Sequence, residues 1–145
     1  MRNTQDLAAV YSPPSGGSPD PPSSTVILLV EDDDRLRHLV MKSLERKTYW
    51  VACARKGEEA WDLFSAHRPL VSLLITEVVL PDMDGLTLAS RARDLAPALP
   101  VLYMAEDDEL SEAVRQGVEN TRNFYLMKPF DHDYVLLKVE AALKG

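Results

Sequence analysis

The sequence has only one cysteine, Cys53, so it offers neither an internal disulfide nor a metal site built from cysteines. It has no run of about 18 apolar residues, the length that a membrane-spanning helix needs. Its N-terminus has no apolar stretch of the kind that a signal peptide carries. The net charge of −7 disfavours nucleic acid and anionic membrane surfaces as partners. We therefore expect a cytoplasmic protein that binds neither, with Cys53 as a buried, unreactive thiol.

Composition separates the chain into two parts. Residues 11–24 read YSPPSGGSPDPPSS and hold five of the ten prolines, so this stretch cannot bury enough apolar surface to offset its ordering entropy. We predict that residues 1–24 are a disordered linker and that residues 25–145 form one domain. That length suffices for a hydrophobic core.

Short apolar runs alternate with helical patterns from residue 25 onward. The runs are typical of strands buried on both faces, and the segments between them space their apolar residues as amphipathic helices do. Strands are predicted at 26–30, 49–54, 70–76, 100–105 and 123–127, and helices near 36–44, 57–68, 86–96, 108–118 and 131–143. Strict alternation predicts an α/β fold, a doubly wound parallel (βα)5 sheet with the flavodoxin-like strand order 2-1-3-4-5.

Charged residues follow three of these strands. Glu31 and Asp32 come after the first strand, Glu77 ends the third, and Lys128 follows the fifth. Strands 1 and 3 are neighbours in the order 2-1-3-4-5, so these side chains should meet at the carboxyl edge of the sheet. Carboxylate oxygens are the ligands that Mg²⁺ prefers, with the lysine offsetting part of the charge. Alternatively, the acids cap the following helix and point to water.

Three motifs carry a resemblance to a known family. They are LLVEDD at 28–33, LPDMDG at 80–85 and KPF at 128–130. With these motifs at this spacing, the chain resembles the receiver domain of two-component response regulators. The similarity is greatest to the C-terminal receiver of hybrid sensor histidine kinases.

The resemblance implies a role for particular positions. Glu31, Asp32 and the backbone carbonyl of Val79 would hold a magnesium ion, and Lys128 would contact the incoming phosphoryl group. Tyr125 would be the aromatic residue that moves inward on activation. It also implies a histidine kinase or transmitter domain as partner. The helix near 108–118, the strand at 123–127 and the last helix would form a dimerisation face.

Two positions depart from the family pattern. Glu77 stands at the phosphoacceptor position, where the family has aspartate, and Ala105 stands at the switch threonine or serine position. The extra methylene of glutamate displaces the carboxylate by about 1.5 Å, and a misplacement of about this size costs on the order of 100-fold in rate. Glu77 could then act as a partial phosphate mimic near Lys128. Ala105 has no hydroxyl to bond a phosphoryl oxygen.

Three hypotheses follow from these substitutions. The first is an atypical receiver that works as a phosphorylation-independent or constitutively biased interaction module rather than as an enzyme. The second is a conventional magnesium-dependent switch in which Glu77 accepts the phosphoryl group. The third is a flavin-binding protein or a phosphatase of the same architecture. A flavin phosphate is disfavoured because the acids of residues 31–34 repel phosphate. A phosphatase with an aspartate nucleophile is disfavoured because residues 77–79 lack its Asp-x-Asp pattern.

Overall fold

All five expected strands are present and form one parallel sheet. The computed structural model describes residues 25–67, 70–109 and 122–144. The strands are β1 (Thr25–Val30), β2 (Tyr49–Ala54), β3 (Leu73–Glu77), β4 (Val101–Ala105) and β5 (Asn123–Met127). Their order is β2-β1-β3-β4-β5, which confirms the predicted topology. The third strand begins later than predicted and includes Glu77 as its last residue.

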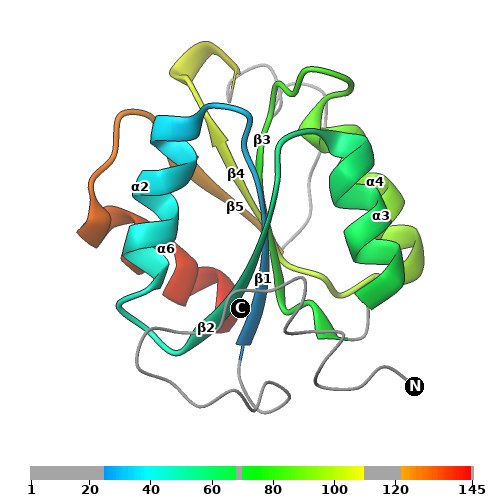
Figure 1. Ribbon diagram of the computed structural model, residues 1–145, viewed down its shortest axis with the longest axis horizontal. Helices are drawn as coiled ribbons and strands as arrows, with labels where there is room; N and C mark the ends of the chain where they lie inside the picture. The colour runs from blue at the N-terminus through cyan, green and yellow to red at the C-terminus, as the bar shows by residue number, and fades with distance from the viewer. Residues whose placement is uncertain (1–24, 68–69, 110–121, 145) are drawn as a thin grey trace.

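Helices cover both faces of the sheet. The described helices are α2 (Asp34–Leu44), α3 (Gly57–His67), α4 (Gly85–Leu95) and α6 (His132–Lys144). Helices α2 and α6 lie on one face and α3 and α4 on the other (Figure 1). None of these described helices has both the length and the apolarity needed to span a bilayer. The predicted linker at 1–24 and most of the helix expected near 108–118 lie outside the described residues.

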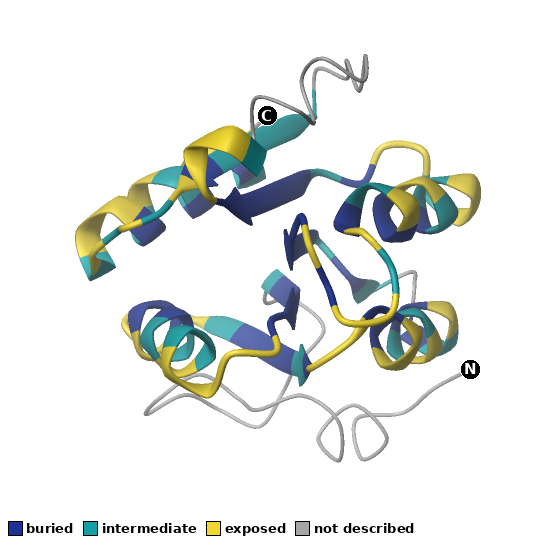
Figure 2. Cartoon of the chain, turned by 90° about the horizontal axis from the view of Figure 1, so that it is seen from above, coloured by how far each residue is buried: buried dark blue, intermediate teal, exposed yellow. Residues whose placement is uncertain are grey.

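Alternating side chains of the strands form two hydrophobic cores. In β1, Val26, Leu28 and Val30 pack toward α3 and α4, whereas Ile27 and Leu29 pack toward α2 and α6. Burial on both faces follows from this sandwich, and the sheet is buried between the helices in Figure 2. The polar carboxyl edge is therefore where the strands can present chemistry.

The loop between β3 and α4 carries two acids that cap helices. Asp84 caps α4 by accepting a hydrogen bond from the Thr87 amide at 2.7 Å. The Asp82 carboxylate accepts from the amides of Gly57 at 2.8 Å and Glu58 at 2.9 Å, so it caps α3 across the loop. Both acids thus bond backbone amides at the starts of helices. The anchored loop fixes the backbone next to the end of β3.

Tyr103 on β4 is completely buried, and its ring stacks on Tyr125 of β5 with centroids 5.8 Å apart. Its hydroxyl is buried and has no hydrogen-bond partner within the described part of the chain. Tyr103→Phe keeps the stacked ring and removes this unsatisfied group. We therefore expect it to raise the free energy of unfolding by about 1 kcal/mol in urea titration.

Tyr103→Leu is the matched control, because it removes both the hydroxyl and the stacked ring. It should be less stable than Tyr103→Phe. A Tyr103→Phe variant less stable than the unaltered chain would show that the hydroxyl is satisfied in solution.

Candidate functional site

Glu77 and Lys128 form an ion pair at the carboxyl edge of the sheet. Glu77 is only 5% exposed, and its Oε1 accepts a hydrogen bond of 2.6 Å from Lys128 Nζ. The Lys128 amide donates to the carbonyl of Ala105 at 2.9 Å, which holds the lysine beside the end of β4. The peptide bond between Lys128 and Pro129 is cis. Ala105 thus contributes a backbone acceptor but no hydroxyl.

Glu31 lies beside this pair at the end of β1. It is 1% exposed, and its Oε2 accepts a hydrogen bond of 3.0 Å from the Asp33 amide. Glu31 Oε1 and Glu77 Oε2 are both buried, and neither has a hydrogen-bond partner among the described residues. The sheet edge therefore gathers two carboxyl groups and one ammonium group, which we call the charged cluster (Glu31, Glu77 and Lys128).

Protonation balances the charge of this cluster. Burial, reinforced by the neighbouring Glu77 carboxylate, raises the pKa of Glu31 to about 9. Burial also raises the pKa of Glu77, although Glu31 and Lys128 oppose that shift. Burial lowers the pKa of Lys128. The hydrogen bond to Glu77 and the charge of Glu77 outweigh this effect, so the pKa of Lys128 is raised. At neutral pH we infer a neutral Glu31 beside an ionised Glu77–Lys128 pair.

This protonation state makes the stability of the fold depend on pH. The folded-state pKa of Glu31, about 9, exceeds its ordinary value of 4.5. The stabilising contribution of its proton is therefore complete below pH 4.5 and is lost as pH rises toward 9. Unfolding in EDTA should show stability falling by at most about 1.4 kcal/mol per pH unit for one proton.

Glu31→Gln is the matched control for this pH dependence, because the amide is neutral at every pH. Its stability should be nearly constant over the same window. A slope that is equal in the variant and in the unaltered chain would assign the effect to another group.

The remaining predicted positions lie around the charged cluster. Asp32 is exposed, so its carboxylate is not part of the buried group. The side chain of Val79 is exposed, and the hydrogen bonds that close its loop use the carbonyls of Val78 and Met83. Tyr125 is half-buried against Tyr103. Cys53 is partly exposed rather than buried, although the apolar surroundings raise its pKa to about 11.

Magnesium fits this donor set in part. The two buried oxygens without partners, on Glu31 and Glu77, are hard ligands of the kind that Mg²⁺ accepts. However, the described residues contain no group of three His, Cys, Asp or Glu side chains arranged to hold a metal ion.

Sequence reasoning missed a residue that supports the charged cluster from α2. Arg37 Nη1 donates to the carbonyl of Glu31 at 3.0 Å. An arginine in the first turn of a helix is usually solvated, so the pattern alone gives no signal for this contact. The Asp33 cap of α2 could have been found, because an acid directly before a helix is a common N-cap.

Comparison with known proteins identifies the family of this chain. The family model of the response regulator receiver domain matches residues 27–140. This chain belongs to that family. The resemblance inferred from the three motifs is thereby confirmed. The chain is a receiver domain of two-component signalling.

Relatives of this receiver domain support the same assignment. The transcriptional regulatory protein SrrA of Staphylococcus aureus is 31% identical over 111 residues, which are 77% of this chain and 44% of that protein. The receiver domain thus spans less than half the length of the curated relatives that it matches.

Solved structures agree with the fold. The receiver domain from the hybrid histidine kinase CckA is 31% identical, with a TM-score of 0.68 over 81% of this chain and 98% of that chain. The signal receiver domain of an HD domain-containing protein from Pseudomonas fluorescens Pf-5 is 28% identical. Its TM-score is 0.73, over 83% of this chain and 88% of that one. The roles of the individual site residues stay predictions.

Proposed function

We propose that this receiver domain relays signals through protein contacts without the family's ordinary acyl-phosphate cycle. The observation that carries the proposal is the hydrogen bond of 2.6 Å between Lys128 Nζ and Glu77 Oε1. The resemblance gives Lys128 the task of contacting a phosphoryl group, and here a carboxylate of the same chain already holds it. The cluster is thus an internal, singly charged substitute for a phosphorylated site.

Two features of the cluster oppose phosphoryl transfer. In-line attack needs a nucleophile placed to within a fraction of an ångström, and the longer side chain of Glu77 is drawn against Lys128. A phosphoryl group on Glu77 would also need stabilisation at the end of β4. Ala105 is completely buried there and has only a methyl side chain to offer.

Magnesium would be bound weakly in this account. Glu31, Asp32 and the backbone carbonyl of Val79 would hold it, and when bound it would neutralise charge on a phosphoryl oxygen. Because burial raises the pKa of Glu31 to about 9, binding at neutral pH has to displace its proton. A melting temperature that rises little in millimolar magnesium at pH 7 and more at pH 9 would fit this linkage.

The proposed partners are a histidine kinase or transmitter domain and a second copy of the chain. The described part of the proposed dimer face, β5 and α6, exposes apolar side chains. Met127 is 43% exposed, Tyr134 36% and Leu137 63%. Such a patch suits a protein contact that needs no change in the charged cluster. The cytoplasmic location stays a prediction that rests on the sequence.

The test is to incubate the chain with magnesium and a small acyl-phosphate donor and to measure its intact mass. We expect no phosphoryl adduct. An adduct that is absent from Glu77→Ala would instead support a conventional switch that uses Glu77. Glu77 Oε2, which Lys128 does not contact, is the atom that favours that second candidate.

A further inference from the structure

Basic residues are concentrated in one segment of this acidic chain. Residues 34–56 hold seven of the 16 lysines and arginines but only two acids, Asp34 and Glu45, whereas the whole chain has a net charge of −7. The segment runs through α2 and the edge strand β2. This side of the molecule is therefore suited to an anionic ligand, unlike the acidic edge that carries the charged cluster.

A groove lies on this basic side, between α2 and β2. It has a volume of about 630 Å³, within the range of small-molecule sites. Its polar lining is Arg35, Arg37, His38 and Lys42 together with the acids Asp34 and Glu45, and Met41 and Cys53 form its apolar part. The sulfur atoms of those two residues lie 3.2 Å apart. We call this feature the α2–β2 groove.

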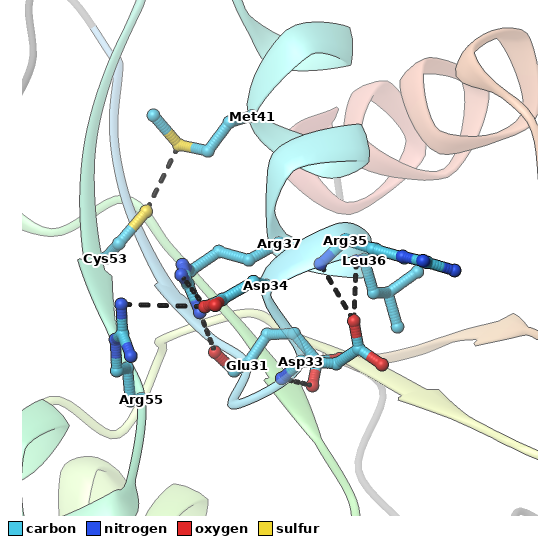
Figure 3. A network of polar contacts seen from close by, with 9 residues as sticks. All are labelled: Glu31, Asp33, Asp34, Arg35, Leu36, Arg37, Met41, Cys53 and Arg55. Carbon is cyan, nitrogen blue, oxygen red and sulfur yellow. Dashed lines mark hydrogen bonds and ion pairs between the residues drawn. The ribbon is translucent and has the colours of Figure 1, made fainter.

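The carboxylate of Asp34, which lines this groove, is contacted by Arg37 of the groove and by Arg55 beside it. Arg37 of α2 and Arg55, just after β2, both pair with Asp34 Oδ1, and the Arg55 contact is 3.5 Å. Figure 3 shows the Asp34 carboxylate next to the Arg37 guanidinium, with a dashed line to Arg55. The Asp34 side chain is 70% exposed, so it can rotate into solvent. The arginine pair is therefore an anion subsite that holds an internal carboxylate.

We propose that the α2–β2 groove binds a phosphate-bearing small molecule of nucleotide size, with a phosphate group replacing the Asp34 carboxylate between Arg37 and Arg55. A phosphate carries nearly twice the charge of a carboxylate and offers more acceptor oxygens. Arginine's planar fork bonds it with two parallel N–H groups. The rest of the molecule lies along Met41 and Cys53. This site is separate from the charged cluster and does not depend on its proposed function.

Arg37 connects this groove with the backbone of the charged cluster. Its Nη1 donates to the Glu31 carbonyl at 3.0 Å while its Nη2 pairs with Asp34. A ligand that binds the Arg37 guanidinium would change the hydrogen bond that Arg37 donates to the Glu31 carbonyl, and with it the environment of the Asp32 amide. The Asp32 amide should therefore report binding, together with the amides of Met41 and Cys53.

The experiment is a nitrogen-15 NMR titration of the whole chain with ATP in EDTA at low salt. Pyrophosphate and a phosphoserine peptide are titrated in parallel. We expect saturable shifts of the groove amides with ATP and a Kd of about 1 mM or lower, with weaker binding of the two other probes. The absence of saturable shifts would overturn the proposal. Tighter binding of the phosphopeptide would also overturn it, because the ligand would then be a modified partner protein.

Matched variants distinguish binding at this site from a general effect of protein charge on ATP affinity. Arg55→Gln should weaken ATP binding at least tenfold, whereas Arg91→Gln should not; Arg91 pairs with Glu58 on the other face of the sheet. Asp34→Asn removes the internal competitor and should tighten binding several-fold, more than Asp62→Asn, an exposed acid on α3. Equal effects within either pair would overturn the proposal.

Discussion

The double variant Glu77→Asp/Ala105→Thr is expected to form an acyl phosphate that the unaltered chain does not form. Aspartate withdraws the carboxylate from Lys128 by one methylene and leaves the lysine free to contact a phosphoryl oxygen. Threonine supplies the hydroxyl that the end of β4 lacks. Intact mass after incubation with magnesium and a small acyl phosphate measures the gain.

The single variants show how much each of the two positions contributes to the gain of phosphorylation. Glu77→Asp alone should be phosphorylated, but phosphorylation should not change its affinity for a partner, because no hydroxyl bonds the phosphoryl group. Ala105→Thr alone should stay unmodified, since Glu77 still holds Lys128. If the double variant folds and remains unmodified, a further defect blocks the chemistry and the account of Glu77 is incomplete.

Lys128→Met should destabilise the fold by about 3–5 kcal/mol at pH 7, the usual cost of removing one partner of a buried ion pair. The Glu77 side chain is only 6% exposed, so its charge would be left without compensation. Glu31 replaces the lysine only in part, because its protonated carboxyl can hydrogen-bond Glu77 but carries no positive charge. Urea titration at pH 7 measures the loss.

Glu77→Gln in the Lys128→Met background should recover most of the lost stability, because the uncompensated charge is then gone. Lys138→Met is the matched control, since Lys138 of α6 lies over the Tyr134 ring at 5.8 Å without an acid partner in an ion pair among the described residues, and it should change stability little. A loss below about 1 kcal/mol for Lys128→Met would mean that the pair behaves as an exposed salt bridge.

The strand order explains how much of the site could be predicted from the sequence. Alternating strand and helix patterns predict a parallel sheet, and strands 1 and 3 are neighbours in the order that five such units favour. That order alone brings Glu31 next to Glu77. Lys128 could be placed at the same edge because it directly follows the fifth strand.

Side-chain direction and protonation could not be predicted in this way. Asp32 directly follows Glu31, yet one side chain is exposed and the other is buried, because the chain turns at this point toward α2. The raised pKa of Glu31 depends on how deeply two carboxyl groups are buried together, which residue spacing does not specify. For the same reason, nothing in the pattern shows that Asp82 caps α3 or that Arg55 pairs with Asp34.

The most direct test is nitrogen-15 NMR of the lysine ammonium groups in the unaltered chain and in Glu77→Gln. We expect one ammonium signal, that of Lys128, to be protected from exchange with water. It should be lost in Glu77→Gln and should not move when magnesium and an acyl phosphate are added. No protected signal, or a signal that shifts with the phosphate donor, would contradict the claim that Glu77 occupies the phosphoryl position.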